Sequence, residues 1–166
     1  LMGFDDSTNT FAARYAEASP ERILPYGGVH ARFTKDPDGD VDRLIELGIR
    51  CLKIHPPHQC HAANAYTEGL EALGRIYRRC EERGLPVLVH TGTSIFPGAR
   101  SKWGNPMELD DVAIDFPKLT IVMAHGGRPL WMEEAFFILR RHPNVYLELS
   151  GIPPARLLEY FPRLAD

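Results

Sequence analysis

Two histidines occupy the same place in two similar stretches of the sequence, directly after a short apolar run and just before glycine. His90 follows Leu85–Val89, and His125 follows Leu119–Ala124. An apolar run of this length that ends near glycine indicates a strand buried on both faces. Parallel α/β proteins build their active sites at the carboxyl ends of such strands, so we expect the two imidazoles to converge. Converging imidazoles suit metal binding and proton transfer.

Each of these histidines has a functional and a structural interpretation. We predict that His90 is a metal ligand; the alternative is a buried histidine that hydrogen-bonds to a backbone carbonyl. We predict a catalytic role for His125, which would orient and deprotonate a water molecule or bind substrate. Its alternatives are a second metal ligand and a structural contact with the Gly126–Gly127 turn. Strand alternation places Leu88 on the face of His90, and Met123 on the face of His125.

Three further side chains could bind substrate at the same edge. Lys53 and His55 close the apolar stretch Arg50–His55, and Arg128 follows the glycine pair after His125. We predict that Lys53 and Arg128 contact a carboxylate, because an inward-facing cation needs an anion and the N–H groups at a helix start also attract one. The alternatives are a lysine that extends to solvent and a tight turn with Arg128 in water.

The run His55–His61 contains three histidines and a cysteine, which raises the question of a separate zinc site. Structural zinc sites need four well-spaced ligands, and no second half of such a site is evident in the sequence. We therefore predict a loop that lines the pocket, with His55 or His58 touching the substrate.

Two other segments flank the predicted site. We predict that Ser94–Trp103 is a mobile lid, with a plain surface loop as the alternative. For Glu148 and Ser150 we favour a strand-end hydrogen bond over a position in the pocket.

These residues are positioned by a unit that repeats six times: an apolar strand, a loop rich in Gly, Pro or His, and an amphipathic helix. The helix signals are an N-cap at Asp40 with a stop at Gly48, a stop at Gly84, a capping box at Asn105–Glu108, a start at Pro129 for residues 130–141, and a last helix over 154–164. The predicted strands are Leu1–Phe4, Ile23–Val29, Arg50–His55, Pro86–His90, Thr120–His125 and Val145–Leu149.

Strands that alternate with helices at this spacing indicate a parallel sheet, either open and doubly wound or part of a (β/α) barrel. Polar residues end four consecutive strands instead of gathering at one switch point, which favours the barrel. Six units fall short of the eight that a closed barrel needs. We predict one α/β domain over residues 1–166, a partial TIM-type (β/α)8 barrel whose two ends look cut.

Composition excludes several classes of function. The 166 residues carry a formal charge of -3 with acidic and basic residues interspersed, so we expect no surface for nucleic acid or anionic membrane. No apolar run is long enough to cross a bilayer. Three cysteines without paired-motif spacing favour a reduced, cytoplasmic setting. An open-sheet nucleotide-binding protein is disfavoured because no glycine-rich fingerprint follows the first strand.

Five motifs follow one another along the chain: Leu24–His30, Leu52–Pro57, Val87–Gly92, Val122–Gly127 and Asn144–Gly151. In this order they resemble the amidohydrolase-related family of metal-dependent (β/α)-barrel hydrolases and decarboxylases. That family has a His-x-His pair at its first strand, histidines at its fifth and sixth, and an aspartate at its eighth. His90 matches the fifth-strand histidine and His125 the sixth. The His-x-His pair and the eighth-strand aspartate have no counterpart, so the chain resembles strands two to seven.

The resemblance implies a metal-dependent hydrolase that acts on a small carboxylated or cyclic substrate through a metal-activated water. It implies a divalent ion, most simply zinc and alternatively manganese, held partly by His90, with His125 moving the proton and with Lys53, His55 and Arg128 binding substrate. It leaves open a non-oxidative decarboxylase on the same scaffold, a carbamylated Lys53 that bridges two metals, and a barrel fragment that lacks metal ligands and does no catalysis. The expected partners are a small-molecule substrate and further copies of the chain, because a barrel without two strands has unpaired edges.

Overall fold

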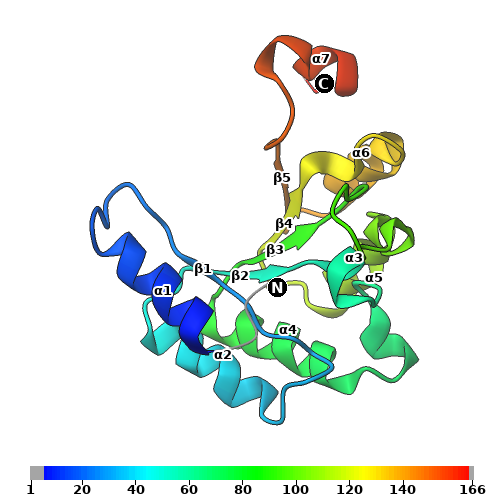
Figure 1. The fold of residues 1–166 in the computed structure, drawn as a ribbon. Helices are drawn as coiled ribbons and strands as arrows, with labels where there is room; N and C mark the ends of the chain where they lie inside the picture. The colour runs from blue at the N-terminus through cyan, green and yellow to red at the C-terminus, as the bar shows by residue number, and fades with distance from the viewer. Residues whose placement is uncertain (1–5, 165–166) are drawn as a thin grey trace.

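The computed structural model describes residues 6–164. Its strands form one parallel sheet in the order β1-β2-β3-β4-β5, so each strand pairs with its neighbour in the sequence. Figure 1 shows the chain passing through the sheet from one edge to the other without returning. A doubly wound sheet would reverse its strand order at a switch point. The α/β architecture is therefore that of a partial (β/α) barrel, which confirms the predicted fold class.

The elements are short, and helices connect consecutive strands. Within residues 6–164, no helix combines the length and apolar character needed to cross a membrane. The strands are β1 (Tyr26–Gly27), β2 (Cys51–Ile54), β3 (Val87–His90), β4 (Ile121–Ala124) and β5 (Val145–Glu148). The helices are α1 (Asp6–Ala16), α2 (Pro37–Glu46), α3 (Pro56–Gln59), α4 (Glu71–Arg83), α5 (Glu108–Asp115), α6 (Met132–Arg141) and α7 (Leu157–Tyr160). Short 3₁₀ helices cover Ala65–Glu68, Ser101–Gly104, His125–Gly127 and Pro154–Arg156.

Five of the six predicted strands are present, and the first of these is much shorter than predicted. The strand expected over Ile23–Val29 consists of Tyr26 and Gly27 alone. The Asn9 side chain of α1 hydrogen-bonds to the backbone of the next residue, Gly28. It accepts from the Gly28 N–H at 2.9 Å and donates to the Gly28 carbonyl at 3.1 Å. Those groups therefore do not continue the ladder. The predicted strand Leu1–Phe4 lies outside the described residues.

The two faces of the sheet bury different sets of side chains. Leu52, Val87 and Met123 are almost fully buried in the main core beneath the helices. Leu88 and Ala124 belong to a small second cluster on the opposite face, toward the barrel interior. Met123 therefore points away from the interior. The prediction that Met123 shares a face with the histidine at the end of β4 was wrong.

The start of α2 differs from the sequence prediction. Its N-cap is Asp36, whose Oδ1 accepts from the Gly39 N–H at 3.2 Å, because Pro37 already has the backbone angle of a first helical residue. The predicted cap, Asp40, lies inside the helix and contacts Thr34 instead. The stop predicted at Gly84 is confirmed, since this residue ends α4 with φ at 64°.

The capping box predicted at Asn105–Glu108 does not form. Asn105 Oδ1 accepts from the Met107 N–H at 2.9 Å, which makes a turn before α5. Glu108, the first residue of α5, accepts from the Ala63 N–H at 2.7 Å instead of reaching back to Asn105. A distant backbone donor has thus replaced the local one.

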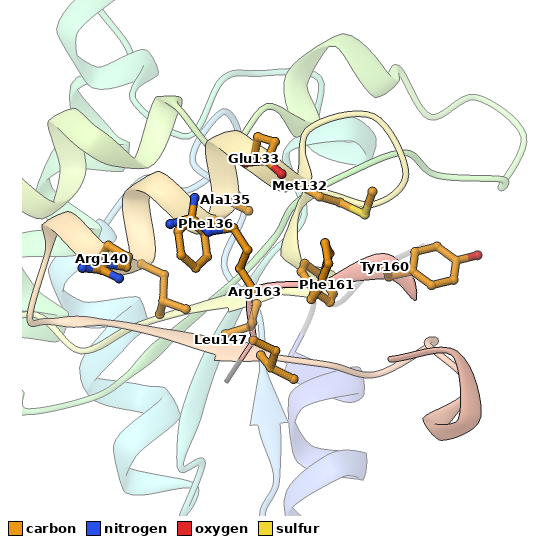
Figure 2. Close-up of a pocket in the computed structure, with 12 residues that line it drawn as sticks. Met132, Glu133, Ala135, Phe136, Arg140, Leu147, Tyr160, Phe161 and Arg163 are labelled. Atoms are coloured by element: carbon orange, nitrogen blue, oxygen red, sulfur yellow. The ribbon is translucent and has the colours of Figure 1, made fainter. Parts of the chain in front are cut away.

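The helix predicted over 154–164 is broken. Pro162 disfavours a helical conformation at Phe161, so α7 ends at Tyr160. Phe161 packs beside α6 and lines an apolar cavity of about 200 Å³ between that helix and the C-terminal segment (Figure 2). The Arg163 guanidinium lies 4.1 Å from the ring centre of Phe136 across this cavity.

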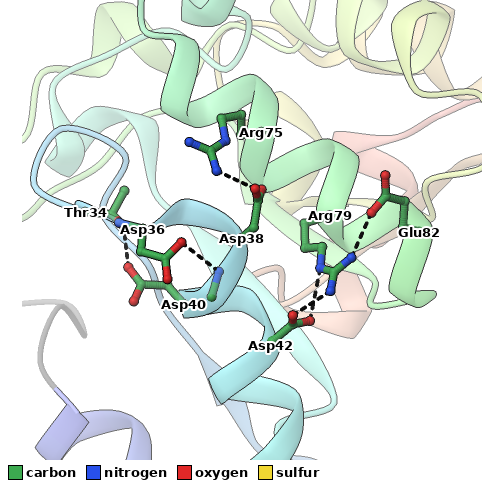
Figure 3. Close-up of polar contacts among 9 residues, drawn as sticks. Thr34, Asp36, Asp38, Asp40, Asp42, Arg75, Arg79 and Glu82 are labelled. Atoms are coloured by element: carbon green, nitrogen blue, oxygen red, sulfur yellow. Dashed lines mark hydrogen bonds and ion pairs between the residues drawn. The ribbon is translucent and has the colours of Figure 1, made fainter.

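Charged side chains join α2 to α4 outside the core. Figure 3 shows Arg75 and Arg79 of α4 reaching Asp38 and Asp42 of α2. Arg79 Nη2 is 2.5 Å from Asp42 Oδ2, and its Nη1 is 3.0 Å from Glu82. These pairs are partly exposed, so each contributes little to stability beyond fixing how the two helices lie side by side.

A close backbone approach at Gly92 gives a prediction about stability. Gly92 has φ at 91°, and a Cβ there would lie 2.2 Å from the Arg128 carbonyl oxygen. Gly48 has a similar φ of 84° but open space around it. We expect Gly48→Ala to lower the free energy of unfolding by about 1–2 kcal/mol, the cost of left-handed backbone for a residue with Cβ. Gly92→Ala should cost at least about 2 kcal/mol more, because the chain must also move apart.

Urea unfolding of the two variants measures this difference directly. Equal losses in Gly92→Ala and Gly48→Ala would show that the backbone near Arg128 moves aside without cost.

Candidate active site

A pocket of about 610 Å³ lies at the carboxyl ends of the strands. The five side chains predicted to act in catalysis or to bind metal or substrate all line it, although they come from three separate strand ends. Their roles stay predictions, but their convergence is a property of the structure. The lining residues are Tyr26, Lys53, His55, Leu88, His90, Thr93, Ser94, Ile95, Phe96, Ala124, His125, Arg128, Glu148 and Ser150.

His90 is the last residue of β3 and lies between two other histidines. Its ring stacks on that of His55 with centres 3.9 Å apart and planes at 15°, and meets His125 edge-on at 4.9 Å. Burial, followed by the proximity of His55 and Lys53, lowers the pKa of His90 to about 2. Among the described residues, nothing hydrogen-bonds to its buried Nε2. His90 is thus a neutral imidazole with a free ring nitrogen.

His55 is held in place through its backbone. It precedes α3, and its N–H donates to Gln59 Oε1 at 3.0 Å, while Gln59 Nε2 donates to the Val29 carbonyl at 3.2 Å. Burial lowers the pKa of His55 to about 3. Its Nδ1 is buried without a hydrogen-bond partner in the described part of the chain. His55 is therefore a second neutral imidazole against the first.

His125 lies one residue beyond β4 in a left-handed backbone conformation, with φ at 66°. This angle breaks the strand alternation, which is why His125 reaches the pocket although Met123 faces the helices. Its Nδ1 is 2.8 Å from the Ser150 carbonyl oxygen. A carbonyl only accepts, so Nδ1 carries the proton and Nε2 is the basic nitrogen of the neutral ring.

Glu148 and Ser150 support His125 from β5. The predicted strand-end hydrogen bond is present: the Ser150 N–H donates to Glu148 Oε1 at 2.6 Å, and its hydroxyl donates to Oε2 at 2.9 Å. Both residues also line the pocket, the role that the sequence analysis ranked lower. Glu148 Oε2 lies 3.8 Å from His125 Nδ1, where its charge would stabilise a protonated ring.

Thr91 is a positioning residue that the sequence analysis missed. Its hydroxyl donates to the Ala124 carbonyl at 2.7 Å and accepts from the Gly127 N–H at 2.9 Å, which fixes the turn after β4 to the end of β3. The signal in the sequence was a hydroxyl directly after His90, at a position where a buried polar group needs partners.

Lys53 and Arg128 bring positive charge to the pocket. Burial lowers the pKa of Lys53 to about 8, although the Glu148 carboxylate acts in the opposite direction. Lys53 has no hydrogen bond or ion pair with another described residue. Arg128 Nε is buried and equally unpartnered within residues 6–164. Partly buried cations that make no ion pair in the described chain can bind an anionic group.

The side chains of the histidine-rich run do not gather at one point among the described residues. His61 turns away from the pocket, with Nδ1 2.9 Å from the Ala62 carbonyl oxygen and its ring 6.2 Å from that of His30. Across residues 6–164, no three His, Cys, Asp or Glu side chains are arranged to hold a metal ion. His90 Nε2 fits the requirement for one ligand, a neutral and unpartnered nitrogen, but the described residues do not complete a set.

The buried histidines predict how stability depends on pH. Burial lowers the pKa of His30 to about 4, of His55 to about 3 and of His90 to about 2, and it also lowers that of His61. The unfolded chain takes up these protons below about pH 6.5 and the folded chain does not, so the free energy of unfolding should fall as the pH falls. Glu108 has the opposite effect on stability. Burial raises its pKa to about 7, so between its ordinary pKa and about pH 7 the folded chain keeps a proton that the unfolded chain has lost.

Urea unfolding at pH 7 and at pH 5 measures the sum of these contributions. We expect a lower free energy of unfolding at pH 5, because four histidines act in that direction and one carboxyl acts against it. His55→Asn should flatten the dependence by up to about 1.4 kcal/mol per pH unit. An unchanged slope in that variant would mean that His55 titrates normally in the folded protein.

The chain is similar to one known protein family and to several solved structures. The amidohydrolase family model matches residues 3–166. Comparison with curated proteins finds no match. Among solved structures, an uncharacterized TIM-barrel protein from Bordetella bronchiseptica is 29% identical with a TM-score of 0.72, covering 90% of this chain and 53% of that one.

Two further structures share the fold at lower identity. The 5-carboxyvanillate decarboxylase of Novosphingobium aromaticivorans, solved with manganese and 3-methoxy-4-hydroxy-5-nitrobenzoic acid, is 20% identical with a TM-score of 0.56, covering 85% of this chain and 47% of that one. A probable 2-pyrone-4,6-dicarboxylic acid hydrolase from Acinetobacter baumannii, solved with citric acid, is 14% identical with a TM-score of 0.57, covering 90% of this chain and 51% of that one. The chain thus spans about half the length of these proteins.

Proposed function

The chain belongs to the amidohydrolase family, and from this premise we propose that it carries part of the active site of a metal-dependent hydrolase acting on a small carboxylated or cyclic substrate. The observation that supports the proposal is one pocket in which the rings of His90 and His125 lie 4.9 Å apart and cationic side chains face the same space. Few arrangements other than substrate binding and proton transfer make use of such a set at strand ends.

We propose that His90 Nε2 holds a divalent ion, either zinc or manganese. A bound ion of this kind supplies Lewis acidity and lowers the pKa of water toward about 7. The depressed pKa of His90 keeps its nitrogen free of a competing proton at neutral pH. The remaining ligands would come from outside residues 6–164, since the described side chains form no complete set.

The other pocket residues have separate roles in this proposal. Lys53 and Arg128 bind the substrate carboxylate and orient the reacting bond, and His55 contacts the substrate from the side of β2. His125 Nε2 takes the proton from the attacking water and returns it to the leaving group. The Ser150 carbonyl and the Glu148 carboxylate stabilise the imidazolium form in between.

Non-oxidative decarboxylation is the second candidate function. It is favoured by the two cations that line the same pocket as His125 and would hold a carboxylate beside a proton donor. In this reaction His125 would protonate the carbon that loses carbon dioxide. The fold relatives include both a decarboxylase and a probable hydrolase, so the scaffold does not separate the two reactions.

Elemental analysis and product analysis of the full-length protein test the proposal. We expect about one zinc or manganese ion per chain, and turnover of at least one member of a panel of carboxylated amides, lactones and aromatic acids. Chelation should abolish turnover and added metal should restore it. Label from H₂¹⁸O in the product indicates hydrolysis, and released carbon dioxide indicates decarboxylation. A protein that binds neither metal would support the third alternative, a non-catalytic barrel segment.

The setting of the protein is also proposed. Cys51, Cys60 and Cys80 are all free thiols, which suits a reduced cytoplasmic compartment. We propose that the chain forms a homo-oligomer, because β1 and β5 each have only one strand neighbour in the described sheet. Native mass spectrometry of the full-length protein measures the number of copies.

A further inference from the structure

Two large apolar side chains are exposed at the mouth of the pocket. Ile95 is 93% exposed and Phe96 is 61% exposed, yet both line the pocket. Single exposed apolar residues are ordinary on protein surfaces, but adjacent ones at the rim of a polar site are typical of a ligand contact. We call these two residues the apolar rim.

The rim is carried by a loop whose base is fixed. The Gly92 N–H donates to the Gly104 carbonyl at 2.7 Å, and the Ser94 N–H donates to Ser101 Oγ at 3.2 Å. A third hydrogen bond ties the loop to α3, since the Arg100 N–H donates to the Pro57 carbonyl at 2.8 Å. These hydrogen bonds hold the base of the loop on both sides of the rim before a ligand arrives, which reduces the entropy lost on binding.

His58 supports the rim from behind. Its ring centre lies 5.8 Å from that of Phe96, and its Nε2 is 3.4 Å from Ser94 Oγ. On its other side, His58 meets His55 edge-on at 4.4 Å. The rim is thus connected to the imidazoles of the site through one side chain.

The same pocket also has charged lining residues, the cations Lys53 and Arg128 and the carboxylate Glu148, and neither cation makes an ion pair in the described chain. We propose that the apolar rim selects carboxylates that carry an apolar body of ring size over small bare carboxylates. The carboxylate lies toward the cations, and the apolar body covers Ile95 and Phe96. This inference rests on the proposed function for the carboxylate end only, because the rim acts on the other end of the ligand.

Three probes separate the two ends: acetate has only the carboxylate, cyclohexanecarboxamide has only the ring, and cyclohexanecarboxylate has both. Ligand-observed NMR titrations of the full-length protein give the three dissociation constants. We expect cyclohexanecarboxylate to bind at least tenfold more tightly than acetate. Phe96→Ala should weaken the binding of cyclohexanecarboxylate about five- to tenfold and leave acetate unchanged. Phe11→Ala, which truncates a 69%-exposed phenylalanine on α1, is the matched control and should change neither.

The outcomes distinguish the rim from the carboxylate site. Equal affinity for the two acids, or wild-type affinity in Phe96→Ala, would overturn the rim while leaving the cations in place. Binding of cyclohexanecarboxamide as tight as that of cyclohexanecarboxylate, and lost in Phe96→Ala, would support the rim and contradict the carboxylate site. Absence of binding by all three probes would overturn both.

Discussion

Replacing His125 with alanine is expected to lower kcat by about 10²- to 10⁴-fold, the usual contribution of general acid–base catalysis. The reason is that the 2.8 Å contact between Nδ1 and the Ser150 carbonyl oxygen fixes the tautomer of this ring and leaves Nε2 as the basic nitrogen of a histidine that lines the pocket. The measurement is steady-state turnover of the panel substrate that the wild-type full-length protein converts.

A second histidine serves as the matched control for this experiment. His142 is buried, and its Nε2 lies 2.7 Å from Asp110 Oδ1, outside the pocket. His142→Asn should change stability but not kcat at a temperature where both variants are folded. Turnover in His125→Ala within threefold of wild type would remove His125 from the reaction. An equal loss of kcat in His142→Asn would show that a general structural change explains the result.

Replacing His90 with leucine is expected to separate stability from metal binding. Its Nε2 is buried without a partner in the described chain, and an unsatisfied buried polar atom costs about 1–3 kcal/mol. In metal-free protein, His90→Leu should therefore unfold at the same urea concentration as wild type or at a higher one. The same variant should bind at least tenfold less zinc or manganese and lose turnover.

Metal content by elemental analysis and urea unfolding after chelation make the two measurements. Full metal content in His90→Leu would contradict a ligand role for His90. A clear loss of stability in the metal-free variant would instead indicate that the ring is held by structural contacts, such as its stacking on His55.

Much of the site could be predicted from local pattern alone. Lys53, His55 and His90 follow or close apolar runs, and strand alternation correctly placed Leu88 on the interior face beneath His90. The prediction failed where a residue leaves the strand. The positive φ of His125 turned its side chain to the pocket, opposite to Met123, and no periodicity in the sequence encodes that turn.

Other errors had the same origin in contacts between distant residues. Glu108 was predicted to cap its own helix, but the Ala63 N–H, 45 positions away, is its partner. For Glu148 and Ser150 a strand-end hydrogen bond was favoured over a place in the pocket; the bond is present, but the packing of β5 beside β4 also brings both residues to His125 and the pocket.

The sequence by itself determined the order of strands and helices and the set of polar residues at the strand ends, because apolar periodicity and helix stops such as Gly84 are local properties. Tertiary structure alone decided which ring nitrogens are free and which imidazoles stay neutral. Those properties depend on burial and on partners such as the Ser150 carbonyl, which are brought close by the parallel pairing of strands far apart in the chain.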